Sequence, residues 1–192
     1  MKELVFATNN AHKLSEVRRM VADRFVIRSL AEIGCRDEIP ETASTLEGNA
    51  LIKARWVKDK YGYDCFADDT GLMVEALGGA PGVMTARFAG EHCTPDDNVT
   101  KLLEVLKTET DRRARFSTVI ALIKDGRETL LEGTVEGLIT HTRMGTDGFG
   151  YDPVFMPAGT GMTFAQMGPD AKNAISHRGR AIARLMEALG VD

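Results

Sequence analysis

The central stretch of the chain reads Cys65-Phe66-Ala67-Asp68-Asp69-Thr70-Gly71-Leu72. A short apolar run of this kind is typical of a buried strand, and here it ends in two adjacent carboxylates. Neighbouring acids beside a core repel each other, and their charge is best compensated by a divalent cation or by protons. Asp, Thr and Gly are also common turn residues, so the stretch alone is compatible with an ordinary turn.

The chain has 192 residues and a formal net charge of −4. This length is enough for one domain with a full core, with room for two lobes. The acidic balance provides no global field for a nucleic-acid duplex, so a polyanion would need a local group of cations. The longest apolar run, Val119–Ile123, is too short to cross a bilayer.

The cysteines and the N-terminus favour a cytoplasmic protein. Cys35, Cys65 and Cys93 are odd in number and widely spaced, which is typical of reduced thiols. Met1 leads directly into a strand-like segment without a signal-peptide pattern. We expect no membrane and no nucleic acid as partner.

The N-terminal segment predicts a strand, a cap and a helix. Leu4-Val5-Phe6-Ala7 is apolar, and Thr8-Asn9-Asn10 can cap a helix with apolar positions at Leu14 and Val17. Lys13 would lie in the first turn, where the helix dipole favours acids instead. Free helix N–H groups, capping side chains and a lysine make a good phosphate pocket, although a solvated surface lysine is the alternative.

A second strand is predicted over residues 25–30, followed by a loop and a helix. Residues 44–47 have capping-box spacing, and Gly62 would end that helix. Lys53 lies on it, and periodicity does not show whether it is at the surface. Glu41 precedes the cap in the loop, where a carboxylate can reach a metal ion or simply meet solvent.

Asp125-Gly126 is the strongest hairpin signal in the sequence. Strand-like segments flank it over residues 116–123 and 129–140. The hairpin adds an antiparallel component to the parallel pairing that the strand–helix–strand units predict. We therefore expect an α/β fold with a mixed sheet.

A glycine-dense segment covers residues 145–153. Its glycine spacing is wrong for a dinucleotide fingerprint. Flexible backbone around an exposed Phe149 would suit the stacking of a flat ring, whereas the alternative is a hairpin loop with a buried Phe149.

Several cations occur at predicted helix starts or in loops, and the local sequence gives no structural reason for them. One group opens the C-terminal helix, which Ser176 can cap. Such a gathering indicates a small polyanionic ligand. The cations are Lys13, Lys53, Lys172 and Arg178.

Several motifs occur in one order over essentially the whole chain. They are Thr8-x-Asn10-x-x-Lys13, Glu41-Thr42, Asn49-Ala50, Lys53-Ala54, the segments 67–72, 77–82 and 148–153, Ala86-Arg87, Lys172 and Ser176-His177-Arg178. With them the sequence resembles the inosine/xanthosine triphosphate pyrophosphatase family, which hydrolyses deaminated purine nucleoside triphosphates. One departure is Met84-Thr85, where the family often has an aromatic residue and a hydroxyl.

The resemblance implies a fold and a reaction. The fold would be an elongated mixed central sheet flanked by helices, with two lobes and a cleft between them, in a single pyrophosphatase domain over residues 1–192. The reaction would convert a nucleoside triphosphate and water to the monophosphate and pyrophosphate with Mg²⁺, usually in a homodimer.

The resemblance also implies residue roles. Asp69 would accept the proton of the attacking water and would bind the metal together with Glu41. The triphosphate would be held by Thr8, Asn10, Lys13 and Lys53, with Asn9 and Thr70 as further substrate-binding residues. Phe149 would stack on the purine, with Gly150, Tyr151, Asp152, Lys172, His177 and Arg178 around its edge.

Two other function classes fit parts of the sequence. An aspartyl phosphomonoesterase needs two acids spaced by one residue after the first strand, whereas Asp68 and Asp69 are adjacent and lie mid-chain. A non-catalytic nucleotide sensor or RNA-binding module would need no general base.

The role of Asp68 stays open at this point. Adjacent strand residues point to opposite faces, so a regular strand cannot aim both acids at one metal ion. Alternation alone does not show which acid faces the site, and the resemblance selects Asp69. Asp68 would then reach the site through the turn at Thr70-Gly71 or hold that turn in place.

Overall fold

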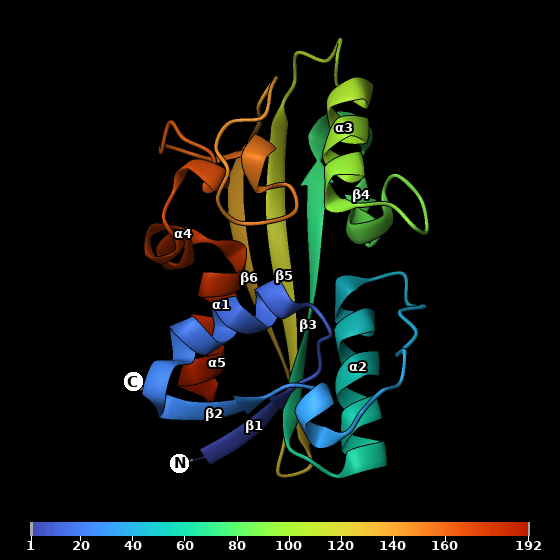
Figure 1. Ribbon diagram of the computed structural model, residues 1–192, viewed down its shortest axis with the longest axis vertical. Coiled ribbons are helices and arrows are strands. Elements are labelled where there is room, and N and C mark those ends of the chain that lie inside the picture. The colour runs from blue at the N-terminus through green and yellow to red at the C-terminus, as the bar shows by residue number, and fades with distance from the viewer. Residues whose placement is uncertain (1, 192) are drawn as a thin grey trace. The chain divides into compact units, whose positions relative to one another are not determined.

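The computed structural model describes residues 2–191, which form a mixed α/β fold (Figure 1). The strands are β1 (Lys2–Phe6), β2 (Phe25–Arg28), β3 (Cys65–Val74), β4 (Pro81–Gly82), β5 (Arg113–Lys124), β6 (Arg127–Ile139) and β7 (Phe155–Pro157). The α-helices are α1 (Ala11–Val21), α2 (Leu46–Tyr61), α3 (Pro95–Val105), α4 (Pro169–Ile175) and α5 (His177–Ala188). Short 3₁₀ helices cover Ala22–Arg24, Ala31–Ile33, Glu75–Leu77, Thr85–Arg87, Asp152–Val154 and Phe164–Gln166.

Within residues 2–191 the strands form one seven-stranded sheet in the order β2-β1-β3-β5-β6-β7, with β4 paired to β3. β1 runs parallel to β2 and β3, whereas β4 and β7 pair antiparallel with their neighbours. Asp125 and Gly126 join β5 to β6 with φ of 51° and 75°, as a two-residue hairpin turn requires. The predicted mixed sheet and hairpin are confirmed.

The chain divides into two compact units. Unit 1 contains the described residues up to Asp69, then Thr118–Gly133, and the residues from Arg178 onward. Unit 2 contains Thr70–Ser117 and Thr134–His177.

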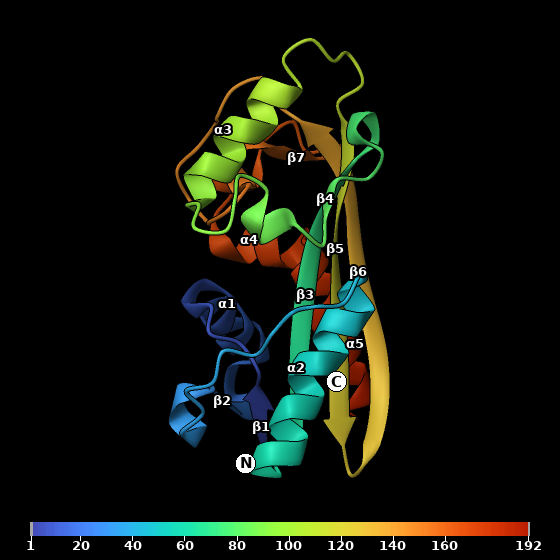
Figure 2. The same cartoon turned by 90° about the vertical axis from the view of Figure 1, so that its right-hand side faces the viewer.

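Unit 1 has a core on each face of its part of the sheet. Helices α1 and α5 cover one face, and α2 covers the other (Figure 2). Alternate residues of β3 divide between the two cores, since Phe66 packs with α1 and α5 while Cys65 and Ala67 pack with α2. This alternation decides where Asp68 and Asp69 point. The turn predicted at Thr70-Gly71 is wrong, because β3 continues through both residues to Val74.

Unit 2 has one apolar core beneath α3. Phe116, Tyr151, Phe155 and Phe164 pack there with Leu102 of α3. The core also holds the short β7 and the segment that follows it, neither of which carries a clear sequence pattern. Thr94 and Asp97 form the capping box that starts α3.

Several predicted boundaries are wrong by a few residues. The second strand ends at Arg28 instead of residue 30. Thr45, not Ser44, caps α2 by accepting the N–H of Gly48. By contrast, the C-terminal helix α5 begins at His177, as predicted, and Ser176 lies between it and a separate helix, α4.

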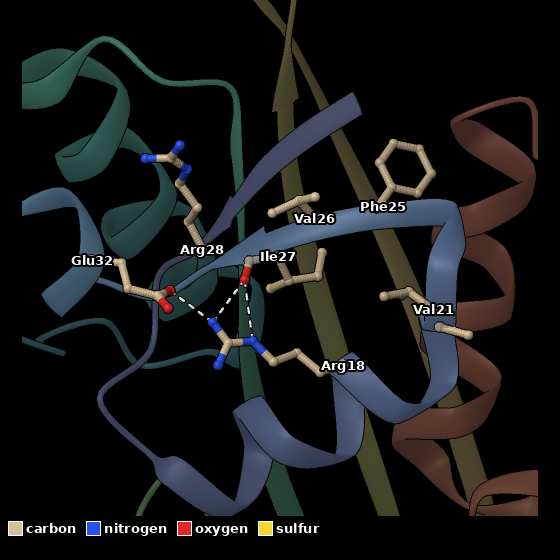
Figure 3. A pocket seen from close by; sticks show the side chains of 8 residues that line it. Arg18, Val21, Phe25, Val26, Ile27, Arg28 and Glu32 are labelled. Carbon is tan, nitrogen blue, oxygen red and sulfur yellow. Dashed lines mark hydrogen bonds and ion pairs between the residues drawn. The ribbon is translucent and has the colours of Figure 1, made fainter. Parts of the chain in front are cut away.

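β2 lies at an edge of the sheet, and a side chain occupies its outward carbonyl (Figure 3). Arg18 donates Nε and Nη2 to the oxygen of Ile27 at 3.2 and 2.8 Å, and Nη2 also contacts Glu32 at 2.7 Å. These residues line a cavity of about 590 Å³ that contains none of the predicted site residues. Arg18 thus occupies one backbone acceptor of this edge strand.

No helix within residues 2–191 has the length and apolar character needed to span a membrane.

Candidate functional site

The alternation along β3 sends Asp68 and Asp69 to opposite faces of the sheet in unit 1. Asp68 points toward α1 and α5, where Lys13 and Arg178 contact it. Asp69 points toward α2, where Asn49 contacts it. This division agrees with the prediction that a regular strand cannot direct both carboxylates at one metal ion.

Each oxygen of the Asp68 carboxylate has its own cation. Lys13 Nζ lies 3.0 Å from Oδ1, and Arg178 Nε lies 3.2 Å from Oδ2. Arg178 also donates Nη1 to Glu16 at 2.7 Å. Burial would raise the pKa of Asp68, but Lys13, Arg178 and Lys53 outweigh it and hold that pKa below its ordinary value.

Asp69 is less enclosed and only partly neutralised. Its residue is 9% exposed, and Asn49 Nδ2 donates to its Oδ2 at 3.1 Å. Burial, with the nearby charge of Glu41, raises the pKa of Asp69 above its ordinary value, although Lys53 and Lys13 oppose the shift. A carboxylate whose proton affinity is raised in this way is suited to accept a proton.

Lys53 connects the loop before α2 with the middle of β3. Its ammonium lies 2.7 Å from the carboxylate of Glu41 and also donates to the backbone oxygen of Asp68. Burial lowers the pKa of Lys53, but the acids Asp68, Glu41 and Asp69 outweigh it and raise that pKa. Lys53 is therefore a buried and charged residue, a point that periodicity left open.

We call these side chains the charged cluster. It lies entirely in unit 1, and its acids outnumber its cations. The cluster consists of Lys13, Glu16, Glu41, Lys53, Asp68, Asp69 and Arg178.

The turn between β1 and α1 is built as a cap. Asn10 accepts the N–H groups of His12 and Lys13 at 3.0 and 3.1 Å, and Thr8 accepts that of Asn10 at 3.1 Å. This confirms the predicted cap and places Lys13 in the first helical turn. Asn9 is exposed in the same turn.

The donor set for a metal ion is small. Glu41 and Asp69 are close enough for the charge of Glu41 to affect Asp69, and no set of three or more His, Cys, Asp or Glu side chains arranged for a cation occurs within residues 2–191. Mg²⁺ is typically held by one or two carboxylates together with water and substrate phosphates. The two carboxylates fit that ion better than a metal that needs a complete protein cage.

Unit 2 holds a second group, which we call the aromatic cluster: Phe149, Asp152, Phe164 and Lys172. Lys172 Nζ lies 2.8 Å from Asp152 Oδ2, and it lies 4.8 and 5.8 Å from the ring centres of Phe149 and Phe164. The same Asp152 oxygen accepts the N–H of Phe149 at 3.0 Å. The ammonium is thus held beside two aromatic rings by a buried acid.

Neighbours of the aromatic cluster include three predicted residues. His177 stacks on Phe116 with centroids 4.6 Å apart and an interplanar angle of 15°. Tyr151 is buried and donates its hydroxyl to the carbonyl of Thr85 at 2.7 Å, and burial raises its pKa. Gly150 has φ of 61° with open space where a Cβ would be.

Thr70 and Thr85 lie near the start and the edge of unit 2. Thr70 follows Asp69 on β3 and is half-buried. Thr85 accepts the N–H of Leu72 at 2.9 Å and donates to the carbonyl of Gly82. The departure at Met84-Thr85 is therefore accommodated by hydrogen bonds to backbone.

The structure brings the predicted residues into two sets. Arg178, expected at the edge of a purine, lies in the charged cluster with Asp68 and Glu16. Sequence reasoning assigned no role to Glu16, Asn49 or Phe164. Asn49 and Glu16 carry a weak signal, since each lies one helical turn from a predicted lysine on the same helix.

The chain matches known proteins over nearly its whole length. The model of the Ham1 family matches residues 4–188. The dITP/XTP pyrophosphatase of Porphyromonas gingivalis is 55% identical over 190 residues, covering 98% of both chains. That of Flavobacterium johnsoniae is 50% identical over 187 residues, covering 97% of both.

Solved structures of Ham1 proteins also match the chain over nearly its whole length. The Ham1 protein of Staphylococcus aureus superposes with a TM-score of 0.89 at 37% identity, with 98% of each chain covered. The HAM1 protein of Coxiella burnetii superposes with a TM-score of 0.90 at 38% identity, with 99% of each covered.

Proposed function

The chain belongs to the Ham1 family, and on that premise we propose that it hydrolyses non-standard purine nucleoside triphosphates to the monophosphate and pyrophosphate. Relatives named dITP/XTP pyrophosphatase support ITP, dITP and XTP as its substrates. The observation that carries the proposal is the division within β3, which directs Asp69 toward α2 near the charge of Glu41 with its pKa raised, while cations surround Asp68. Membership confirms the family predicted from the motifs.

We propose that the charged cluster binds the triphosphate. Cleavage of a phosphoanhydride depends mainly on positioning and on neutralising the charge that spreads in the transition state. Lys13 and Lys53 supply that charge, and the capped turn at Thr8, Asn9 and Asn10 supplies side-chain hydroxyl and amide groups at a helix start. Arg178 belongs to the same cluster, since its guanidinium donates a hydrogen bond to Asp68.

Glu41 and Asp69 would hold a Mg²⁺ ion. When bound, that ion polarises the phosphate oxygens and offsets their negative charge. Asp69 would orient the attacking water and take its proton, with Asn49 fixing the orientation of the carboxylate. Thr70 would contact the substrate beside Asp69.

The aromatic cluster would bind the purine. Phe149 offers a ring for stacking, and Lys172 places a donor beside it. A 6-oxo purine presents an acceptor to that donor, whereas adenine presents an amino group and leaves it unmatched. Gly150, Tyr151, Asp152 and His177 would line the edge of the base.

A panel of nucleotides assayed for pyrophosphate tests the proposal. We expect kcat/KM for ITP and XTP to exceed that for ATP by at least about 10²-fold, because the unmatched donor penalises adenine. Release of orthophosphate alone, or equal rates on all purines, would overturn it.

Gly148 provides a test of purine binding. A Cβ at this position would lie 2.0 Å from Asp152 Oδ2, the oxygen that holds Lys172. We expect Gly148→Ala to raise KM for ITP about tenfold, as the loss of one charged hydrogen bond would. Steady-state kinetics measure the change.

Gly159 is the matched control. It has φ of 79°, close to the 74° of Gly148, but nothing lies within 4 Å of its Cβ position. Gly159→Ala therefore carries a similar backbone strain without the clash, and KM should stay within about twofold. Equal KM values for the two variants would remove Asp152 and Lys172 from purine binding.

We further propose that the whole chain acts as one pyrophosphatase domain, as a cytoplasmic homodimer. The described cysteines Cys35, Cys65 and Cys93 are free, which suits a reducing compartment. Light scattering coupled to size exclusion would measure the oligomeric state.

A further inference from the structure

Asp68 is the most enclosed acid of the charged cluster. Its side chain is 2% exposed, and that of its partner Arg178 is 3% exposed. Lys13 is more accessible, with 15% of its side chain exposed. The order of exposure places Lys13 nearest to solvent and Asp68 behind it.

Both oxygens of Asp68 are committed. Oδ1 pairs with Lys13 at 3.0 Å, and Oδ2 pairs with Arg178 at 3.2 Å. A buried carboxylate that left these partners would separate buried Arg178 and largely buried Lys13 from the acid that they share, which is strongly unfavourable. Asp68 therefore stays in place when a ligand arrives, and it is not available as a metal ligand.

The pair with Asp68 uses one of the three N–H donors of Lys13. The others can point to a ligand while the ammonium stays fixed. Without Asp68, the buried cations Lys13 and Arg178 would face each other with less compensation, and a flexible lysine would turn away.

We propose that Asp68 is a positioning residue, whose buried carboxylate holds the Lys13 ammonium where a triphosphate binds. The inference rests on the proposed function for the identity of the ligand. It assigns Asp68 a role different from that of Asp69, although the two are neighbours on β3.

Simple charge counting gives the opposite expectation. Asp68 is a negative charge beside an anion site, so its neutralisation should strengthen anion binding if charge alone matters. Positioning predicts weaker binding instead. The sign of the change therefore distinguishes the two roles.

Calorimetric titration with inorganic tripolyphosphate and Mg²⁺ tests the proposal. Tripolyphosphate carries no base, so binding reports on the charged cluster alone. We expect Asp68→Asn and Lys13→Met each to raise Kd about tenfold or more. The double variant should be no weaker than Lys13→Met within about threefold, because Asp68 acts through Lys13.

Asp64→Asn is the matched control. It makes the same chemical change at an acid that pairs with a lysine, Lys58, at 2.9 Å outside the charged cluster, and it should change Kd less than about threefold. Circular dichroism shows whether each variant folds. If Asp68→Asn does not fold, Asp68→Glu replaces it in the titration. This variant keeps the charge but moves the carboxylate by one methylene, and it should also weaken tripolyphosphate binding.

Unchanged or tighter binding by Asp68→Asn, independent effects in the double variant, or no binding by the wild-type protein would overturn the inference. The nucleotide panel decides the proposed function separately. The wild-type protein could release pyrophosphate from ITP while Asp68→Asn binds tripolyphosphate normally. That result would overturn the positioning role of Asp68 and leave the proposed function intact.

Discussion

Asp69→Asn should lower kcat for ITP by about 10³-fold, because general base catalysis of this kind typically contributes 10²–10⁴-fold. The amide keeps the shape of the side chain but cannot take a proton from water. Asn49 can still contact it, since an amide oxygen accepts the same hydrogen bond. Steady-state pyrophosphate release measures kcat, and calorimetry measures nucleotide binding, which should remain largely intact.

Asp59→Asn is a suitable control for this variant. It makes the same chemical change at an exposed position of α2, outside the charged cluster. Wild-type kcat is expected for it. An active Asp69→Asn protein would remove Asp69 from the role of general base.

Removal of divalent metal should abolish turnover, with a loss of at least about 10²-fold because such an ion supplies several kcal/mol of charge stabilisation. The charged cluster contains three cations and four carboxylates, so it is not positive by itself. A triphosphate carries about four negative charges, since its terminal phosphate has a second pKa of about 6. The cluster cannot offset that charge alone.

The measurement is pyrophosphate release from ITP in excess EDTA, followed by the addition of excess Mg²⁺. Activity should return with Mg²⁺, and circular dichroism should show the same fold in both conditions. Full turnover in EDTA would contradict the assignment of Glu41 and Asp69 as metal ligands.

Much of unit 1 could be predicted from sequence because its signals are local. The apolar run before Asp68, the cap at Asn10 and the Asp125-Gly126 turn each depend on neighbouring residues. Strand alternation correctly separated Asp68 from Asp69. These rules need no knowledge of the tertiary structure.

The partners of Asp68 could not be predicted in the same way. Arg178 lies 110 positions away in the chain, in the first turn of α5, and the sequence showed it only as an unexplained cation. Only the packing of α5 against β3 shows that it compensates a buried acid.

Unit 2 was harder to predict because its segments lack periodicity. β7 has three residues, and α4 has seven, so neither shows a repeating apolar pattern. Lys172 was found by its motif, whereas Phe164 beside it carried no signal. Long-range packing around Phe155 and Phe164 decides this part of the fold.

Hydrolysis of ITP at the charged cluster is tested most directly by ³¹P NMR of ITP incubated with Mg²⁺ and the wild-type protein. Hydrolysis at the charged cluster predicts inosine monophosphate and pyrophosphate in equal amounts, without orthophosphate at early times. Inosine diphosphate together with orthophosphate would contradict it.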